Sequence, residues 1–435
     1  MVKLFGLRSI LVAVVLIAYQ VLPASQILLD TLVERGVLTE EEALYAKKQS
    51  SVIVESITPQ SKVRLMQFWH LRFQTLDQNY SNADDVYKYN FALRRIIPVF
   101  IADVSQNSRV MITLYLPSSS VINTVRYEHN VDTDFLCGSL WAGYEAVWFC
   151  MEENESGTQL KTPDRSIINM YFGGGDHGYL GGQTRSYSTA EAFSGYHAGL
   201  FWNGKFVKNK KLIYRLAFTN SKPENIDFDG SNSFALWGSL GVDDKSEDFH
   251  LRTGVNAGYS HRVVSASRQA MLPSTVGDYG NCFGINPYFW LTNGNFTIQS
   301  EFVATSLKYG SSISNDRPLY TVDSPRANPW GFYFLGAYKF NVNPFGALEP
   351  VVRYSFINSD GRGITENVVF YKAESRGGLY NKVSSFYAGV NWYVLGNALK
   401  YQFGAEYAMF RDGVVGGISK EANTFMFIAQ VQIIL

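Results

Sequence analysis

From about residue 60 onward, the sequence repeats segments of about ten residues in which apolar and polar side chains alternate. In the stretch "RVMITLYL", Val110, Ile112 and Leu114 share one face of the expected strand. Arg109 and Thr113 share the other face. Gly, Asn, Asp, Ser and Pro separate one segment from the next, as turns do between strands. The pattern therefore predicts an all-β chain of antiparallel strands with one apolar and one polar face.

Two all-β architectures fit this alternation, a soluble sandwich and a transmembrane antiparallel β-barrel. Charged residues make up only 17% of the chain and aromatic residues 15%, and Tyr, Trp and Phe recur near the strand ends, as in the aromatic girdles of barrels. Past the first 24 residues, no apolar run is long enough for a spanning helix. Because only helices and closed barrels satisfy the backbone in lipid, a barrel of roughly fourteen to eighteen strands is favoured.

The stretch "FMFIAQVQIIL" at the end of the sequence alternates in the same way. The side chains expected to face lipid are those of Phe425, Phe427, Val431, Ile433 and Leu435. Gln430 and Gln432 are expected to face the lumen. We predict that this strand pairs with the first strand, near residues 63–73, and so closes the cylinder.

The first 60 residues have a different character from the rest of the chain. Residues 1–24 carry Lys3 and Arg8 ahead of a short apolar core and small residues, which predicts a secretory signal peptide, with a membrane anchor as the alternative. Residues 25–58 have helical spacing and a capping-box pattern, which predicts a periplasmic leader of two short helices. This leader is either a solvated spacer or a docking element. Residues 59–435 are assigned to the barrel.

The sequence offers little for catalysis, cofactors or nucleic acids. The formal net charge is zero, so no nucleic-acid partner is expected. "GGGDHG" fits a dinucleotide-binding pattern by letter but lacks a βαβ context. None of the six His residues lies in a nucleophile motif, and the three Cys residues have no metal-site spacing, although a Cys137–Cys150 disulfide stays open. We therefore predict no enzyme activity, no cofactor and no metal.

Several longer stretches resemble successive landmarks of one family, in order along the chain: "YNFALRRIIPVFIADV", "AGYEAVWFCMEENESGTQLKTPDRS", "GALEPVVRYSFINSDGRG" and "SSFYAGVNWYVLGNALKYQFGAEYA". "LLDTLVERGVLTEEEA" is similar to a helical leader that many members carry. The family is the phosphate-selective porin O and P family. The resemblance implies a sixteen-stranded barrel in the bacterial outer membrane, contact with its lipid, a homotrimer and a lumen that conducts small anions such as phosphate. The chain departs from the family pattern in the residues that follow Arg94–Arg95.

The polar faces of the strands are expected to line the lumen, and they carry more basic than acidic residues. The candidate pore-lining and anion-binding residues are Arg64, Arg72, Arg109, Arg126, Arg215, Arg252, Lys339, Arg353 and Lys400. The acids expected on the same faces are Glu128, Glu301, Glu349 and Glu406. Arginine suits phosphate and carboxylate geometry, so these faces predict an anion preference. The alternative is a structural role, in which the arginines pair with acids and stabilise the wall of the barrel.

The resulting hypothesis is an outer-membrane porin for passive diffusion of small hydrophilic solutes, with a preference for anions or phosphate. Two alternatives remain open at this stage, a non-selective porin and a plugged barrel with a structural or adhesive role. Residues 311–329 are expected to form a loop, either at the surface or folded inward to narrow the pore.

Overall fold

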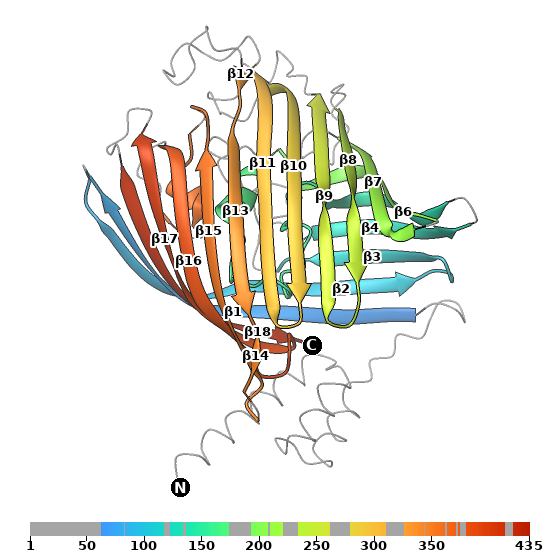
Figure 1. The fold of residues 1–435 in the computed structure, drawn as a ribbon, viewed down its shortest axis with the longest axis horizontal. Helices are drawn as coiled ribbons and strands as arrows, with labels where there is room; N and C mark the ends of the chain where they lie inside the picture. Colours follow the sequence, from blue (N-terminus) through green and yellow to red (C-terminus); the bar gives the residue numbers. More distant parts are fainter. Residues whose placement is uncertain are drawn as a thin grey trace.

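The chain forms a closed antiparallel β-barrel (Figure 1). The computed structural model describes residues 62–435, with gaps at 82, 117–121, 134–135, 174–192, 208, 221–233, 262–278, 310–325, 343, 362, 371–372, 375–379 and 414–420. The expected signal peptide and helical leader lie outside the described residues, as does most of the 311–329 loop.

The strands are β1 (Lys62–Tyr80), β2 (Val86–Asp103), β3 (Ser108–Leu114), β4 (Ile122–Asp132), β5 (Cys137–Ala146), β6 (Tyr196–Phe206), β7 (Asn209–Thr219), β8 (Phe234–Lys245), β9 (Phe249–His261), β10 (Tyr279–Asn293), β11 (Phe296–Tyr309), β12 (Arg326–Ala327), β13 (Trp330–Tyr338), β14 (Phe340–Asn341), β15 (Ala347–Asn358), β16 (Tyr380–Tyr393), β17 (Leu399–Gly413) and β18 (Ala422–Ile434). The helices are α4 (Ile167–Phe172) and α6 (Glu366–Val369). Neither helix is long and apolar enough to cross a membrane.

Each strand pairs with its neighbour in sequence, and β18 returns to pair with β1. Segments β12 and β13 both pair with β11, whereas β13 and β14 both pair with β15. These three segments are therefore one interrupted wall strand, and the 18 segments make 16 wall strands. The barrel fold and its sixteen strands are confirmed.

The predicted closure is also confirmed, slightly displaced along β1. Phe68 pairs with Ile434 at one end of the seam, and Tyr80 pairs with Ala422 at the other. The backbone N–H of Gln67 donates to the carbonyl of Leu435 at 2.9 Å. All backbone groups in the hydrocarbon region can then be satisfied within the wall, as lipid requires.

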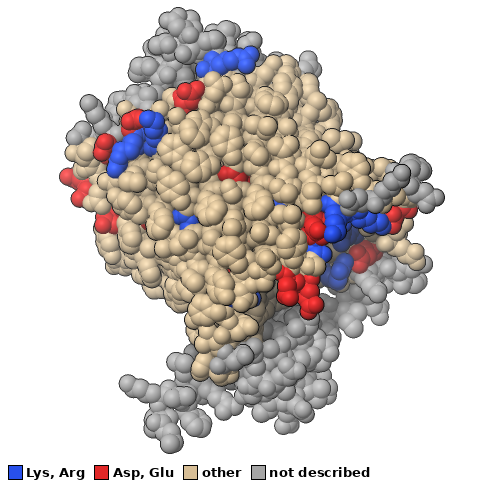
Figure 2. Space-filling model, viewed as in Figure 1, with Lys and Arg blue, Asp and Glu red and all other residues tan. Residues whose placement is uncertain are grey.

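The two faces of the wall have the expected chemistry. On β18, Phe425 and Phe427 point outward and are 43% and 37% exposed, whereas Gln430 and Gln432 point inward and are 1% and 0% exposed. The middle of the visible outer wall carries almost only uncharged residues, and charged residues gather toward its edges (Figure 2). Such an outer band matches a hydrocarbon environment.

Strand β2 contains one irregularity that the alternating pattern does not anticipate. His70 pairs with Arg95, but Leu71 pairs with Leu93, so Arg94 is an extra residue in the β2 register. A β-bulge of this kind places two consecutive side chains on the same face. Arg94 and Arg95 are both buried and both point into the barrel.

The connections between strands are unequal at the two ends of the barrel. One end has short turns, such as residues 294–295 between β10 and β11. The other end has the longer connections, including residues 147–195 between β5 and β6. The first part of that connection, residues 147–172, folds into the barrel, and we call it the inward segment. The barrel therefore holds an internal core formed by this segment and by inward-facing side chains of the wall.

Candidate functional site: the lumen and its inward segment

The inward segment is tightly bound to the barrel interior. All six residues of helix α4 are buried, and the Ser166 hydroxyl accepts a hydrogen bond from the Asn169 N–H as the helix N-cap. Cys150 has a φ of 60°, which is uncommon for a residue other than glycine and marks a sharp local turn. Glu301 of β11 accepts hydrogen bonds from the N–H groups of Met151 and Glu152, at 2.6 and 2.8 Å. The wall thus satisfies backbone groups that the turn leaves free.

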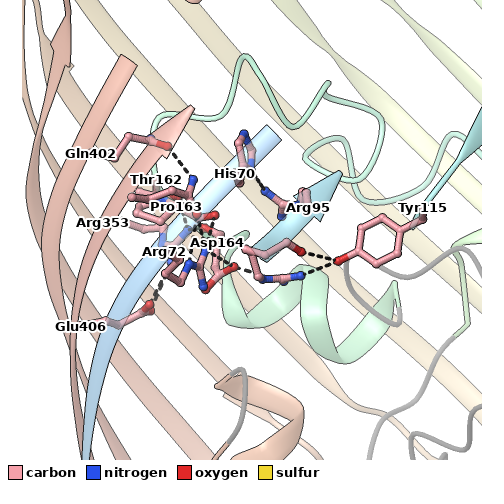
Figure 3. A network of polar contacts seen from close by, with 12 residues as sticks. His70, Arg72, Arg95, Tyr115, Thr162, Pro163, Asp164, Arg353, Gln402 and Glu406 are labelled. Carbon is pink, nitrogen blue, oxygen red and sulfur yellow. Dashed lines mark hydrogen bonds and ion pairs between the residues drawn. The ribbon is translucent and has the colours of Figure 1, made fainter. Parts of the chain in front are cut away.

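Asp164 is the main electrostatic anchor of the inward segment (Figure 3). Its carboxylate lies 2.6 Å from Arg72 of β1 and 3.2 Å from Arg94 of β2. The guanidinium groups of Arg72, Arg94 and nearby Arg95 outweigh the cost of burial and hold the pKa of Asp164 well below its usual range. Arg95 donates to Nδ1 of His70, which fixes the His70 proton on Nε2 toward Gln432.

The inward segment makes a second set of contacts with β15 to β18. Arg353 donates to the Thr162 hydroxyl at 2.8 Å and pairs with Glu406 at 3.2 Å. Lys400 donates to two backbone carbonyls of the segment, those of Thr158 and Leu160, both at 3.1 Å. These cations fix the position of the segment through its backbone as well as through its charges.

The nine predicted basic residues fall into three structural groups. Arg72, Arg353 and Lys400 are buried beneath the inward segment. Arg109, Arg126 and Arg252 pair with Glu128, Glu145 and Glu155. The others are Arg64, which pairs with Asp103, and Arg215 and Lys339, which lie over the rings of Trp148 and Tyr393.

The four predicted lumen acids lie on the inward face, and each has a defined partner. Glu128 pairs with Arg109, Glu406 with Arg353, and Glu349 with Lys161 of the inward segment at 2.6 Å. Glu301 accepts the two backbone N–H groups described above. The bracing role that the sequence left as an alternative is therefore real for many of these charges, and their role toward anions remains a proposal.

Sequence reasoning missed the charged residues that come from irregular backbone. Arg94 and Arg95 were visible only as a break in the alternation, because a strict period of two places just one of them inward. Asp164, Lys161 and Arg165 lie in a loop, where no period indicates which side chains face the lumen. The one signal in the sequence that this loop enters the lumen was the high density of charged residues in "MEENESGTQLKTPDR", directly next to apolar residues.

The exposure of lumen-facing residues differs between two sides of the barrel. On β15 to β18 and β1, the inward polar residues are covered by the inward segment; Asn391, Lys400 and Gln432, for example, are 0% exposed. On β3 to β9, the side chains of Arg109 and Arg252 are 38% and 26% exposed. The inward segment therefore covers the polar face of β15 to β18 most completely. It also contacts β7 and β9 through Trp148 and Glu155, but Arg109 and Arg252 stay partly accessible there.

No group of three or more His, Cys, Asp or Glu side chains suitable for a metal ion occurs among the described residues. Cys137, Cys150 and Cys282 are all free thiols, so the Cys137–Cys150 disulfide is not formed.

Comparisons with known proteins agree with this architecture. A family model described as phosphate-selective porin O and P matches residues 275–408. Among solved structures, an anion-selective porin from Comamonas acidovorans is 11% identical with a TM-score of 0.53, over 86% of this chain and 100% of that chain. OmpF of Salmonella typhi in complex with daunomycin is 11% identical with a TM-score of 0.49, over 86% and 98%. No match was found among curated proteins.

The first of these structures shares the fold of the chain, and the matched residues run from just before β10 into β17. They include the whole of the stretches "GALEPVVRYSFINSDGRG" and "SSFYAGVNWYVLGNALKYQFGAEYA", on which the sequence resemblance partly rests. The resemblance to the phosphate-selective porin O and P family is thus confirmed over residues 275–408, in a chain with the fold of an outer-membrane porin.

Proposed function

We propose that this protein is an outer-membrane porin through which small hydrophilic solutes diffuse passively, with a preference for anions. The family match and the barrel fold support a channel rather than an enzyme. In this proposal residues 1–24 direct export, residues 25–58 form a periplasmic leader, and the outer band of the barrel contacts lipid. Assembly as a homotrimer and passage of phosphate follow from the family resemblance.

The observation that carries the proposal is the unequal cover of the lumen wall. A solute can pass only where polar side chains remain accessible. Arg109 on β3 and Arg252 on β9 are partly exposed, although other lumen-facing polar residues of β3 to β9, such as Asn256, are buried. The path would then run past these two arginines and beside the inward segment, which sets the width and hence the size limit.

The charge presented along that path supports anion preference. In each ion pair of this side, the arginine is more exposed than its acid. Arg109 is 38% exposed against 5% for Glu128, and Arg252 is 26% exposed against 15% for Glu155. A solute would meet guanidinium groups first, so local anion concentration would rise although the pairs are formally neutral.

One observation favours a second candidate, a barrel with a plugged lumen. The inward segment buries a continuous apolar core that includes Phe149, Ile168 and Phe172 against the wall. Such packing suits a fixed plug as well as a constriction. The two functions differ in whether the folded barrel conducts.

Conductance in a planar lipid bilayer tests the proposal. We expect stepwise openings from the purified, heat-modifiable barrel and a reversal potential in a salt gradient that indicates anion over cation permeation. Folded barrels that give no steps would favour the plugged barrel instead.

Replacing Arg109 with Gln should lower the anion-to-cation permeability ratio by about twofold, because it leaves the Glu128 carboxylate less compensated at the lumen surface. The measurement is the reversal potential of the variant against the unaltered protein. Lys382→Gln removes a positive charge at the exposed end of β16, beside Asp412, and serves as the matched control. An unchanged ratio in Arg109→Gln, or an equal fall in both variants, would contradict the assignment.

A further inference from the structure

Five lumen-facing side chains on strands β7 to β10 form a cluster that is composed almost entirely of hydrogen-bond donors. The members are Arg215, Ser239, Arg252, Tyr288 and Trp290. Arg215 and Ser239 are direct cross-strand partners, as are Arg252 and Trp290. The register therefore brings residues from four strands to one patch of the lumen wall, which we call the donor cluster.

Two glycines make the cluster possible. Tyr288 lies next to Gly254 on β9, and Gly254 pairs with Gly241 on β8. A Cβ atom added at Gly241 or Gly254 would lie 2.6 or 2.8 Å from the Tyr288 hydroxyl oxygen. The Tyr288 ring thus crosses two strands over a floor that only glycine provides, and its hydroxyl reaches the strand that carries Ser239.

Three donors of the cluster are buried and incompletely satisfied within the part of the chain that the structure describes. These are the Tyr288 hydroxyl, the Ser239 hydroxyl and the indole Nε1–H of Trp290, whose residues are 4%, 8% and 3% exposed. A buried donor without an acceptor typically costs about 1–3 kcal/mol, so such groups call for an explanation. The Tyr288 and Ser239 hydroxyls lie close enough to interact, so one of them can donate to the other. The remaining hydroxyl hydrogen and the indole N–H still lack an acceptor. These two donors beside two arginines point to an acceptor that the chain itself does not supply.

The positive charge of the two arginines is only partly balanced by acids of the chain. Arg215 donates through Nε to the Asn203 amide and has no carboxylate partner among the described residues. Arg252 pairs with Glu155 at 2.6 Å and remains 26% exposed. The other acid near Arg215 is Asp243, which is bound to His250 at 2.8 Å. Positive charge is therefore incompletely matched at Arg215.

Apolar surface borders the donors on the side of the inward segment. Met151 packs with Tyr288 and Trp290 in a small apolar cluster. The Arg215 guanidinium lies 5.7 Å from the centre of the Trp148 ring, and that of Arg252 lies 4.4 Å from the centre of the Trp290 ring. Indole rings and a thioether offer dispersion contacts to a ligand body rather than hydrogen bonds to an anion.

We propose that the donor cluster is a binding site for the carboxylate of a small organic acid with an apolar or aromatic body. The guanidinium groups of Arg215 and Arg252 would bind the carboxylate oxygens, a geometry for which arginine is suited. Tyr288, Ser239 and Trp290 would donate to the same oxygens, and the rings and Met151 would contact the body. The inference rests on the proposed porin function, since the ligand must enter the lumen.

The test uses the purified full-length barrel in detergent and isothermal titration calorimetry with benzoate, acetate and inorganic phosphate. This readout does not require conduction, so it separates the site from the proposed function. We expect benzoate to bind at least tenfold more tightly than acetate or phosphate, because only benzoate uses both parts of the site.

Three variants sharpen the test. Arg215→Gln should weaken benzoate binding by about tenfold or more, and Tyr288→Phe, which removes only a hydroxyl, by about three- to tenfold. Lys382→Gln should leave binding unchanged. Retained heat-modifiable migration shows that each variant is folded.

Each other outcome overturns the proposal in a distinct way. Equal affinity for benzoate and acetate would show that the apolar side chains do not contribute to binding. Phosphate affinity that depends on Arg215 would assign the cluster to an inorganic anion. Benzoate binding that survives Arg215→Gln and Tyr288→Phe would place the ligand elsewhere. Conduction without benzoate binding would refute the site and leave the porin function standing.

Discussion

Replacing Asp164 with Asn is expected to release the inward segment from the wall and raise the conductance of the barrel severalfold. The Asp164 carboxylate is the shared partner of Arg72 and Arg94, at 2.6 and 3.2 Å, and the side chains of both arginines are 0% exposed. Removing one partner of a buried ion pair typically costs about 3–5 kcal/mol, since the remaining charge stays desolvated. Two guanidinium groups would be left in this state.

The two arginines can regain hydration only if the inward segment moves away. We therefore expect the amide protons of residues 147–172 to exchange much faster in Asp164→Asn, while the amides of the wall strands keep their protection. Asp103→Asn is the matched control, because Asp103 pairs with Arg64 at an exposed site where such pairs contribute only about 0–1 kcal/mol. Normal conductance and unchanged exchange in Asp164→Asn would show that the segment is held by its apolar core alone.

The second expected result concerns the state in which the inward segment and α6 are packed and buried, which we call the closed arrangement. We expect its stability to fall as the pH rises from 4.5 to 7. Burial raises the pKa of Glu153, in the inward segment, to about 7; Glu152 and Glu301 add to the shift, whereas Arg165 and Arg95 oppose it. Burial likewise raises the pKa of Glu366, in α6, to about 7, with the hydroxyls of Tyr380 and Tyr80 opposing. Both carboxyl groups are therefore neutral when buried at acidic pH.

The sign of the effect follows from proton linkage. A released carboxyl group has a pKa near 4.5, so between pH 4.5 and 7 the released state loses its proton while the buried state keeps it. The closed arrangement then loses on the order of 3 kcal/mol per group across this window and nothing further above it. Asp164 does not cancel the trend, because its lowered pKa makes its contribution constant until the pH falls toward 4.

Conductance and amide exchange at pH 5 and pH 8, corrected for the intrinsic exchange rate, measure this dependence. We expect more frequent opening and weaker protection of residues 147–172 and of α6 at pH 8. Glu153→Gln and Glu366→Gln should each reduce the difference, whereas Glu421→Gln, at an exposed position, should not. A pH response that persists in the double variant Glu153→Gln/Glu366→Gln would assign it to other groups.

The wall of the barrel was predictable because apolar and polar side chains alternate along its strands with a period of two. In lipid a strand must place apolar side chains outward and pair both edges, so alternation alone indicates the face of residues such as Phe427 and Gln430. The closure of β18 on β1 followed from the same argument. The exact register did not, because the seam begins at Gln67 rather than at Val63.

The inside of the barrel was predictable only in part. The sequence identified Arg72 and Arg353 as lumen-facing, but it did not predict that residues 147–172 would cover them. The partner of Arg72 is Asp164, 92 residues away and outside any strand. A bulge at Arg94 and the buried turn at Cys150 break local periodicity, and their positions depend on contacts that form only in the assembled barrel.

The seam between β1 and β18 also constrains the order of assembly. The side chains of His70 and Gln432 meet across this seam although 362 residues separate them in the chain. Contacts this distant form late, because a long loop must be closed before any pairing energy is gained. Until β18 arrives, the open edge of β1 is a site for pairing with the wrong strand or another molecule. The lifetime of that open edge, rather than the stability of the finished barrel, would then determine how efficiently the protein reaches its membrane-inserted form.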